Sequence, residues 1–344
     1  METEQRLKRL CAAGAPCGFE GPAVAEARTL LEPLMDEVWV DRLGNLVGVR
    51  LCGKPGAKKL LLDAHLDEVG LTVTGMEQGF LRFAAIGVDA RMLPDREVTV
   101  LADPPLRGVV ACLPPHVLSA EDREKAPKVE EMFIDVGLGQ EEAERRIPLG
   151  TPVVYRSSFL RLGERQLCSK AMDDRVCFEA LLRTAELLRG KPLNVDLYVL
   201  GSTREEVGGM GARVVTQAIG PDCCVAVDVT FGRAPDTPKD EAMVMGGGPA
   251  VGIGPNCTRW MVRRLLDRAE KGNIPVQKEV MEGSSGTNGW TMQICKEGVA
   301  TAVVCIPLKY MHTPVETVEK ADIEDTARLL ATFAAGLGEG DWHD

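Results

Sequence analysis

The sequence lacks the features that mark several large classes of protein. It has no excess of positive charge, since 40 Lys and Arg stand against 51 Asp and Glu and the formal net charge is -11. That balance opposes binding to nucleic acid or to anionic membranes. No apolar run approaches the ~20 residues of a membrane-spanning helix, and the first residues contain no apolar signal-peptide core. We therefore expect a soluble, cytoplasmic protein with no nucleic-acid or membrane partner.

Further absences narrow the chemistry. The 11 cysteines are scattered and form no C-x-x-C motif, so reduced thiols are expected and a disulfide framework is not. No G-x-S-x-G motif occurs, and the glycine-rich stretch GGGPAVGIGP does not match G-x-G-x-x-G. A serine triad and a dinucleotide-binding loop are therefore unsupported. Only four histidines are present, namely His65, His116, His312 and His343.

Strand-like and helical patterns alternate in two parts of the chain. In the first part, the helical pattern PAVAEARTLLEPLMDEV leads to strand-like NLVGVR and KLLLDAHLDEVGLTV. After about residue 165 the apolar runs VDLYVLGST, CVAVDVT and TAVVCIP alternate with helical patterns. This alternation predicts an α/β fold with a mainly parallel sheet flanked by helices on both faces.

The middle of the chain has a different texture. Short β-like pieces such as FLRFAAIG, REVTVLAD and RGVVACL are separated by Gly, Pro and charged turns. We therefore predict a discontinuous catalytic domain over residues 1–71 and 165–344, interrupted by an inserted β-rich domain over residues 72–164.

Potential metal ligands stand at the ends of the predicted strands. His65 closes the run KLLLDA, and Asp67, two residues on, shares its face in an extended chain. A metal-bound imidazole commonly donates its other N–H to a carboxylate, so this pair supplies a ligand and a residue that orients it. Asp228 lies at the end of CVAVDVT, and His312 follows TAVVCIP within a few residues. Ligands of open α/β sheets gather at such carboxyl ends.

Two acidic pairs complete this set. The strand VDLYVLGST runs into Glu205-Glu206 and a glycine-rich turn. Adjacent side chains diverge, so one carboxylate can hold a metal while the other faces a water as general base. Asp173 and Asp174 precede a predicted helix, where one can cap the helix and the other can turn toward the site. Spacing alone does not decide which member of each pair takes which role.

Together, two histidines and several carboxylates without a thiolate suit Zn, Co or Mn in a catalytic site. A pair of such ions would hold a hydroxide and polarise a scissile carbonyl. The pattern therefore predicts amide or ester hydrolysis without a covalent intermediate.

The segments AHLDEVG, KAMDDR, TREEVGGMGA, AVDVT and KYMHTPVE, in this order, resemble the M42 family of cocatalytic metallopeptidases, which includes glutamyl and leucyl aminopeptidases. The resemblance extends from DEVWVDRLGNLVG to the last helix. It implies a two-metal aminopeptidase acting on short peptides, with a barrel-like insertion that serves as a dimerisation domain. It also implies a homo-oligomer in which dimers form a tetrahedral dodecamer.

The resemblance implies a role for each candidate residue. Glu205 would be the general base, and Asp67 would support His65. Asp174 would be secondary. The ligands of the two ions would be His65, Asp173 as the bridge, Glu206, Asp228 and His312.

Two positions depart from the family pattern. Asn288 stands where relatives usually have an acidic residue, and Arg204 stands where they often have an uncharged one. This charge change favours acidic or neutral substrate side chains over basic ones. The alternatives are a deacylase or carboxypeptidase on the same metal core, or an assembly protein that has lost activity.

Overall fold

A computed structural model of the chain describes all residues except 1, 236, 239–241, 339–341 and 343–344. His343 and part of the predicted 165–344 segment therefore lie outside the described residues. None of the described helices is long and apolar enough to cross a membrane.

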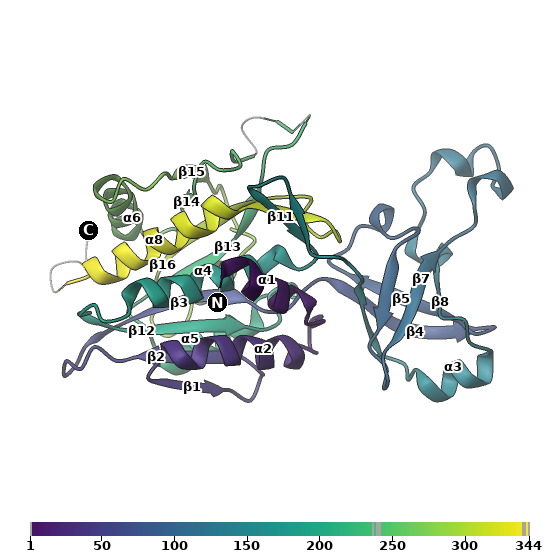
Figure 1. The fold of residues 1–344 in the computed structure, drawn as a ribbon, viewed down its shortest axis with the longest axis horizontal. Coiled ribbons are helices and arrows are strands. Elements are labelled where there is room, and N and C mark those ends of the chain that lie inside the picture. Colours follow the sequence, from purple (N-terminus) through teal and green to yellow (C-terminus); the bar gives the residue numbers. More distant parts are fainter. Residues whose placement is uncertain (1, 236, 239–241, 339–341, 343–344) are drawn as a thin grey trace.

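An 11-stranded sheet forms the larger part of the molecule (Figure 1). Its four central strands run parallel, and the strands toward both edges pair antiparallel. The predicted α/β class is confirmed, and parallel pairing joins the four central strands and, off the main path of the sheet, one further pair. The main path of the sheet, in spatial order, is β1 (Glu37–Val40), β2 (Leu46–Arg50), β12 (Val195–Ser202), β3 (Lys58–His65), β13 (Cys223–Phe231), β16 (Ala300–Lys309), β17 (Glu316–Glu319), β11 (Gln166–Ser169) and β10 (Leu160–Leu162), while β14 (Ala250–Ile253) and β15 (Gln277–Val280) lie off it.

Helices cover both faces of this sheet. Alternate residues of β3 show the division, because Leu60 and Leu62 belong to one apolar cluster and Leu61 to another. The first cluster includes residues of α1 (Thr3–Ala12), α2 (Gly21–Leu31), α4 (Met172–Leu188), α6 (Arg259–Lys271) and α8 (Lys320–Gly336). The second includes residues of α5 (Met210–Ile219) and α7 (Gly289–Met292). Strands buried on both faces explain the continuous apolar runs in the sequence.

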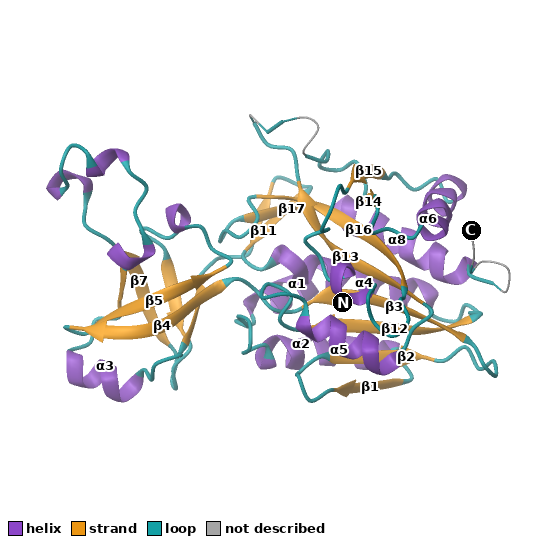
Figure 2. Cartoon of the chain, turned by 180° about the vertical axis from the view of Figure 1, so that it is seen from behind, coloured by secondary structure: helices purple, strands orange, loops and turns teal. Residues whose placement is uncertain are grey.

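A closed six-stranded barrel projects from one end of the sheet (Figures 1 and 2). Its core is apolar and includes Leu81, Val98 and Ile134. In order around the barrel, the strands are β4 (Gly70–Glu77), β5 (Phe80–Ile86), β8 (Phe133–Asp135), β7 (Leu106–Ala111), β6 (Glu97–Val100) and β9 (Pro152–Tyr155), and α3 (Gln140–Arg146) packs beside them. Short 3-10 turns span Glu32–Leu34, Ala90–Met92, Pro115–Val117, Asp122–Glu124 and Val129–Glu131.

The barrel strands therefore lie between Gly70 and Tyr155, and the large sheet resumes with β10. The division of the chain into domains at residues 72 and 164 stays a prediction.

Candidate metal centre

The candidate residues meet at the end of the large sheet where the central parallel strands have their carboxyl ends. This end is called the carboxyl edge, or sheet edge, below. Strands β12, β3, β13 and β16 are parallel neighbours, so their carboxyl ends share that edge. The chain leaves β3 at this edge and enters the barrel at β4, so the edge faces the barrel. The central strands thus bring together side chains from segments far apart in the sequence.

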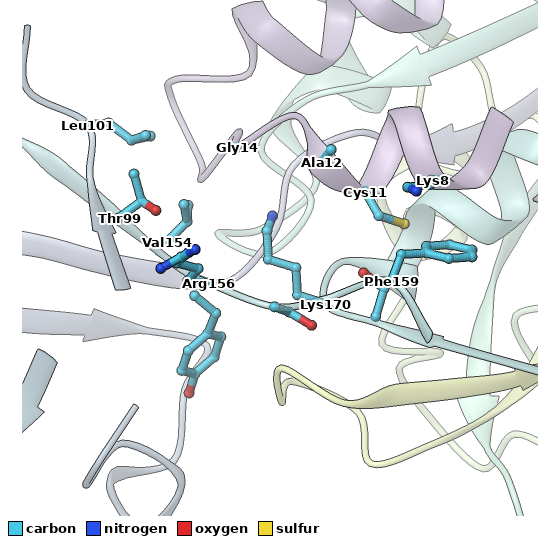
Figure 3. Close-up of a pocket in the computed structure, with 13 residues that line it drawn as sticks. Lys8, Cys11, Ala12, Gly14, Thr99, Leu101, Val154, Arg156, Phe159 and Lys170 are labelled. Carbon is cyan, nitrogen blue, oxygen red and sulfur yellow. The ribbon is translucent and has the colours of Figure 1, made fainter. Parts of the chain in front are cut away.

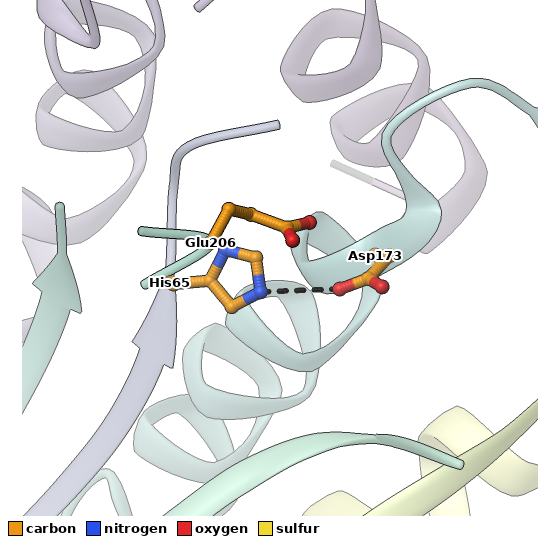
Figure 4. A group of neighbouring side chains, drawn as sticks. All are labelled: His65, Asp173 and Glu206. Carbon is orange, nitrogen blue, oxygen red and sulfur yellow. Dashed lines mark hydrogen bonds and ion pairs between the residues drawn. The ribbon is translucent and has the colours of Figure 1, made fainter. Parts of the chain in front are cut away.

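His65 is the centre of the cluster. Its side chain is 1 % exposed, and its Nε2 lies 3.1 Å from Oδ1 of Asp173 (Figure 4). Its Nδ1 lies 3.2 Å from the backbone carbonyl oxygen of Asp67 and 3.5 Å from Oδ1 of the same residue. Potential ligand atoms of His65, Asp173 and Glu206 all fall within 4.8 Å of one another.

Asp173 lies between the two site histidines. One of its oxygens faces His65, and the other is 3.5 Å from Nε2 of His312. The same His312 nitrogen is 3.3 Å from Oε1 of Glu206. Burial lowers the pKa of His312, but Asp173 and Glu206 outweigh burial and raise it to about 11. The site therefore has a strong negative field that favours a cation.

A second group of potential ligands includes Asp174. Atoms of His65, Asp174 and Asp228 also lie within 4.8 Å of one another. Oδ2 of Asp174 accepts the backbone N–H of His65 at 3.0 Å, whereas Oδ1 is buried without a hydrogen-bond partner. Burial raises the pKa of both aspartates well above the ordinary value. Buried carboxylates need compensation by a cation or a proton, so this donor set fits a divalent metal.

Asp67 holds the backbone of the neighbouring site residues through hydrogen bonds. Its two oxygens accept the backbone N–H groups of Glu205 at 3.0 Å and Glu206 at 3.1 Å. The thiol of Cys17 donates to the same carboxylate at 3.1 Å. Burial opposes ionisation, but the hydrogen bond with His65 and the Glu205 N–H lower the pKa of Asp67 below its usual value. An ionised Asp67 therefore holds both glutamates and His65 in place.

Glu316 is a site residue that the sequence patterns did not identify. It is 1 % exposed, and its carboxylate accepts the backbone N–H groups of Asp173 at 3.1 Å and His312 at 2.8 Å. One side chain thereby fixes two potential ligands from different elements. The only signal in the sequence was its position four residues after His312.

The backbone is also strained where it presents these residues. His312 has a φ of 62°, and Arg204, directly before Glu205, has a φ of 58°. Ala171, two residues before Asp173, has a φ of 54°. Left-handed conformations of non-glycine residues persist where the surrounding structure over-determines them, often at functional sites.

Residues 44–329 match the family model described as M42 glutamyl aminopeptidase. The chain belongs to this family. The match covers most of the chain and identifies an enzyme, an aminopeptidase that hydrolyses peptide bonds.

Individual relatives agree with this membership. The chain is 34% identical to a lysyl aminopeptidase of Pyrococcus furiosus, over 96% of each chain. It is 26% identical to a glutamyl aminopeptidase of Lactococcus lactis subsp. cremoris, over 91% of this chain and 90% of the relative.

Solved structures show the same fold over nearly the full length. An aminopeptidase from Desulfurococcus kamchatkensis has a TM-score of 0.91 at 34% identity, covering 97% of this chain and 95% of the other. A TET aminopeptidase from a marine sediment Thaumarchaeota archaeon has a TM-score of 0.93 at 27% identity, covering 99% and 98%.

Within this M42 aminopeptidase, Glu205 differs from the potential ligands. Its side chain makes no hydrogen bond or ion pair with any residue that the structure describes, whereas Glu206 faces His312. Burial, with further contributions from Glu206, Asp67 and Asp173, raises the pKa of Glu205 to about 8. Glu205 is therefore the acidic residue left unengaged beside the cluster.

Asn288 lies in a buried contact. It is 2 % exposed, and its amide donates to Oδ2 of Asp63 at 2.8 Å and to Oγ of Ser202 at 2.9 Å. The amide thus links β3 to β12. On β3 it binds Asp63, two residues before His65, and on β12 it binds Ser202, three residues before Glu205. Asparagine at this position avoids placing a second carboxylate against Asp63.

Proposed function

We propose that this M42 aminopeptidase removes N-terminal residues from short peptides with two divalent cations per subunit and Glu205 as the general base. The observation that carries the proposal is the convergence of two imidazoles and several buried carboxylates at one sheet edge, with a single glutamate left unengaged. The donor set contains no thiolate, which suits Zn, Co or Mn.

The residues that would hold the cations are His65, Asp173, Glu206, Asp228 and His312. Asp173 suits the bridging role because its two oxygens face different histidines. Cations bound there would polarise the scissile carbonyl and stabilise the negative charge that develops on its oxygen.

Glu205 would accept the proton of the attacking water and pass it to the leaving amine. A pKa near 8 in the absence of cations places this carboxylate in a useful range for proton transfer. Asp67 would act as a positioning residue, because it binds the backbone of both glutamates and lies against His65.

The test is Glu205→Gln, which keeps the shape of the side chain and removes the base. We expect kcat to fall about 10²–10⁴-fold while metal content stays at the wild-type level. Glu206→Gln should instead reduce metal content, and Glu297→Gln, at an exposed position, should change neither. Loss of metal in Glu205→Gln but not in Glu206→Gln would mean that the two roles are reversed.

Substrate class is tested with matched peptides. An aminopeptidase releases the first residue only when its amino group is free, so N-acetylated peptides should not be cleaved. Equal cleavage of free and acetylated peptides would favour a deacylase or another hydrolase on the same core. Arg204 is the position from which we expect a preference for acidic or neutral first residues, and a profile led by basic residues would contradict that expectation.

We also propose that the enzyme is a cytoplasmic homo-oligomer, with the barrel as its dimerisation domain and a tetrahedral dodecamer as its full assembly. In support, the TET1 peptidase of Pyrococcus horikoshii, which assembles into a tetrahedron or an octahedral shell, has a TM-score of 0.86 to this chain at 27% identity, covering 98% of this chain and 100% of that one. Light scattering after size exclusion tests this proposal, and a monomer at assay concentration would contradict it.

A further inference from the structure

A cavity lies where the barrel meets the large sheet. It encloses about 310 Å³ between α1, the barrel end and the segment that returns from the barrel (Figure 3). None of the proposed metal ligands lines it. Its walls are formed by Lys8, Cys11, Ala12, Gly14, Thr99, Leu101, Val154, Tyr155, Arg156, Ser157, Phe159, Ser169 and Lys170.

The charges in this cavity are all positive. Lys8, Arg156 and Lys170 line it, and no Asp or Glu does. Arg156 pairs with Glu97 at 2.9 Å, and Lys170 pairs with Glu68 at 2.6 Å. Within the described part of the chain, the exposed Lys8 at the cavity has no ion-pair partner. Because the cavity is lined by basic side chains and by no carboxylate, it favours an anionic ligand.

Buried polar groups also remain available at the cavity wall. Lys170 is 6 % exposed, and its side chain extends into the central space of Figure 3, toward the side where Arg156 lies. Two of its three ammonium donors are used by the oxygens of Glu68, so one donor is left. Ser169 is 3 % exposed and lines the cavity, and its hydroxyl has no hydrogen-bond partner among the described residues.

Part of the remaining wall is apolar. Leu101 and Val154 come from the barrel, and Phe159 comes from the returning segment. If an inorganic anion were bound, these apolar side chains would stay in contact with water. A ligand with a short hydrocarbon body would instead cover them.

We propose that this cavity binds a small organic carboxylate of about amino-acid size. The carboxylate accepts hydrogen bonds from Lys170, Ser169 and Arg156, and its apolar body packs against Leu101 and Phe159. Charge-assisted hydrogen bonds from the buried Lys170 ammonium and the more exposed Arg156 guanidinium are the strong contacts in such a site. Because Ser169 and Lys170 belong to the large-sheet part of the chain and Leu101 to the barrel, a ligand that contacts all three stabilises the attachment of the barrel to the sheet.

The experiment uses the full-length, metal-loaded protein and 4-methylpentanoate, which has a carboxylate and an apolar body but no amino group. Isothermal titration should show saturable binding to the wild type. Ser169→Ala and Arg156→Ala, which each remove a donor to the carboxylate, should each weaken it at least tenfold. Arg91→Ala, which removes a surface arginine paired with Asp89, and Lys191→Ala, at an exposed position, should leave it unchanged.

Two further probes test the chemistry of the site. Inorganic phosphate carries the charge without the apolar body, and 4-methylpentan-1-ol carries the body without the charge, so both should bind more weakly than 4-methylpentanoate. Equal affinity for the alcohol would overturn the role of the cations. Equal affinity for phosphate would overturn the role of the apolar wall.

Unchanged binding in both cavity variants would overturn the proposal if their melting temperatures equal that of the wild type. Titration of metal-depleted protein separates this site from the metal centre, since the cavity should bind the probe with and without metal. Binding lost with the metal would place the probe at the metal centre and overturn the assignment. The readout is independent of turnover, so failure of the proposed aminopeptidase mechanism would not affect it.

Discussion

The barrel and the carboxyl edge of the large sheet use buried space in opposite ways. Within residues 70–155, Thr151 is the one buried polar side chain that is not aromatic among the described residues, and the barrel core is aliphatic and aromatic. At the sheet edge, buried charged or titratable side chains from segments far apart in the sequence lie close together in space. They include His65, Asp67, Glu68, Lys170, Asp173, Asp174, Arg175, Asp228 and Glu316.

This difference separates a part of the molecule with an ordinary apolar core from the part that holds the candidate site. A buried carboxylate without compensation costs several kcal/mol or takes up a proton, so evolution of a stable core avoids it. The sheet edge tolerates such groups because hydrogen bonds and, as proposed, cations compensate them. Among the described residues of the barrel, no buried carboxylate needs such compensation.

The largest effect on metal content and activity is expected at Asp173, a buried carboxylate of the sheet edge. Asp173→Asn removes one negative charge between His65 and His312 and should abolish stable occupancy of both metal positions. We expect at least a 10³-fold loss of kcat/KM together with reduced metal content, in line with the large contribution of metal-ion catalysis. Plasma mass spectrometry and peptide kinetics measure the two quantities. Full metal content with normal turnover would remove Asp173 from the site.

A smaller effect is expected at Glu316, whose carboxylate contacts the backbone of two proposed ligands. Glu316→Gln keeps the shape of the side chain but replaces one carboxylate oxygen by an NH₂ group. The amide can therefore no longer accept hydrogen bonds from both backbone N–H groups on separate oxygens. Metal affinity should fall about 10–100-fold, as for other outer-shell partners of metal ligands. Metal titration should show weaker affinity, and excess metal should restore much of kcat, which a purely unfolded variant would not do.

The pH dependence of kcat/KM should reflect Glu205. Its pKa is raised to about 8, and a general base must be ionised, so activity should fall as pH decreases through that value. Bound cations would neutralise the neighbouring carboxylates and move the midpoint below 8. We expect a decline of about tenfold per pH unit on the acid side. Metal content must be measured at each pH, and activity that rises toward low pH at constant metal content would contradict the assignment.

The smallest effect on chemistry is expected in the barrel core. Ile134→Ala should lower the free energy of unfolding by about 2–5 kcal/mol through the cavity it leaves. The kcat per bound metal should stay within about twofold, because local core losses are felt chiefly as stability. Leu62→Ala, a similarly buried change on β3 below His65, is the matched comparison, and it should lower both stability and kcat. Equal effects of the two changes on kcat would erase the contrast.

Much of the fold followed from local patterns in the sequence. The apolar runs that lead to His65, Glu205 and Asp228 predicted buried strands, and the structure places each of them in the centre of the sheet. The antiparallel edges were not predicted, because short strands such as β10 and β17 carry no distinctive periodicity. The exact ends of the barrel were likewise set by strand pairing.

The sequence by itself determined the residue types of the site and their order along the chain, because strand ends and turn residues leave local signals. Only the tertiary structure decided which of these groups touch. It placed Asp173 between two histidines and brought Asp174 beside Asp228. It also placed the Glu316 carboxylate against the backbone of two proposed ligands and gathered three basic side chains around a cavity at the barrel. Such contacts depend on strand order and chain return, which bring together residues more than 100 positions apart and leave no periodic trace in the sequence.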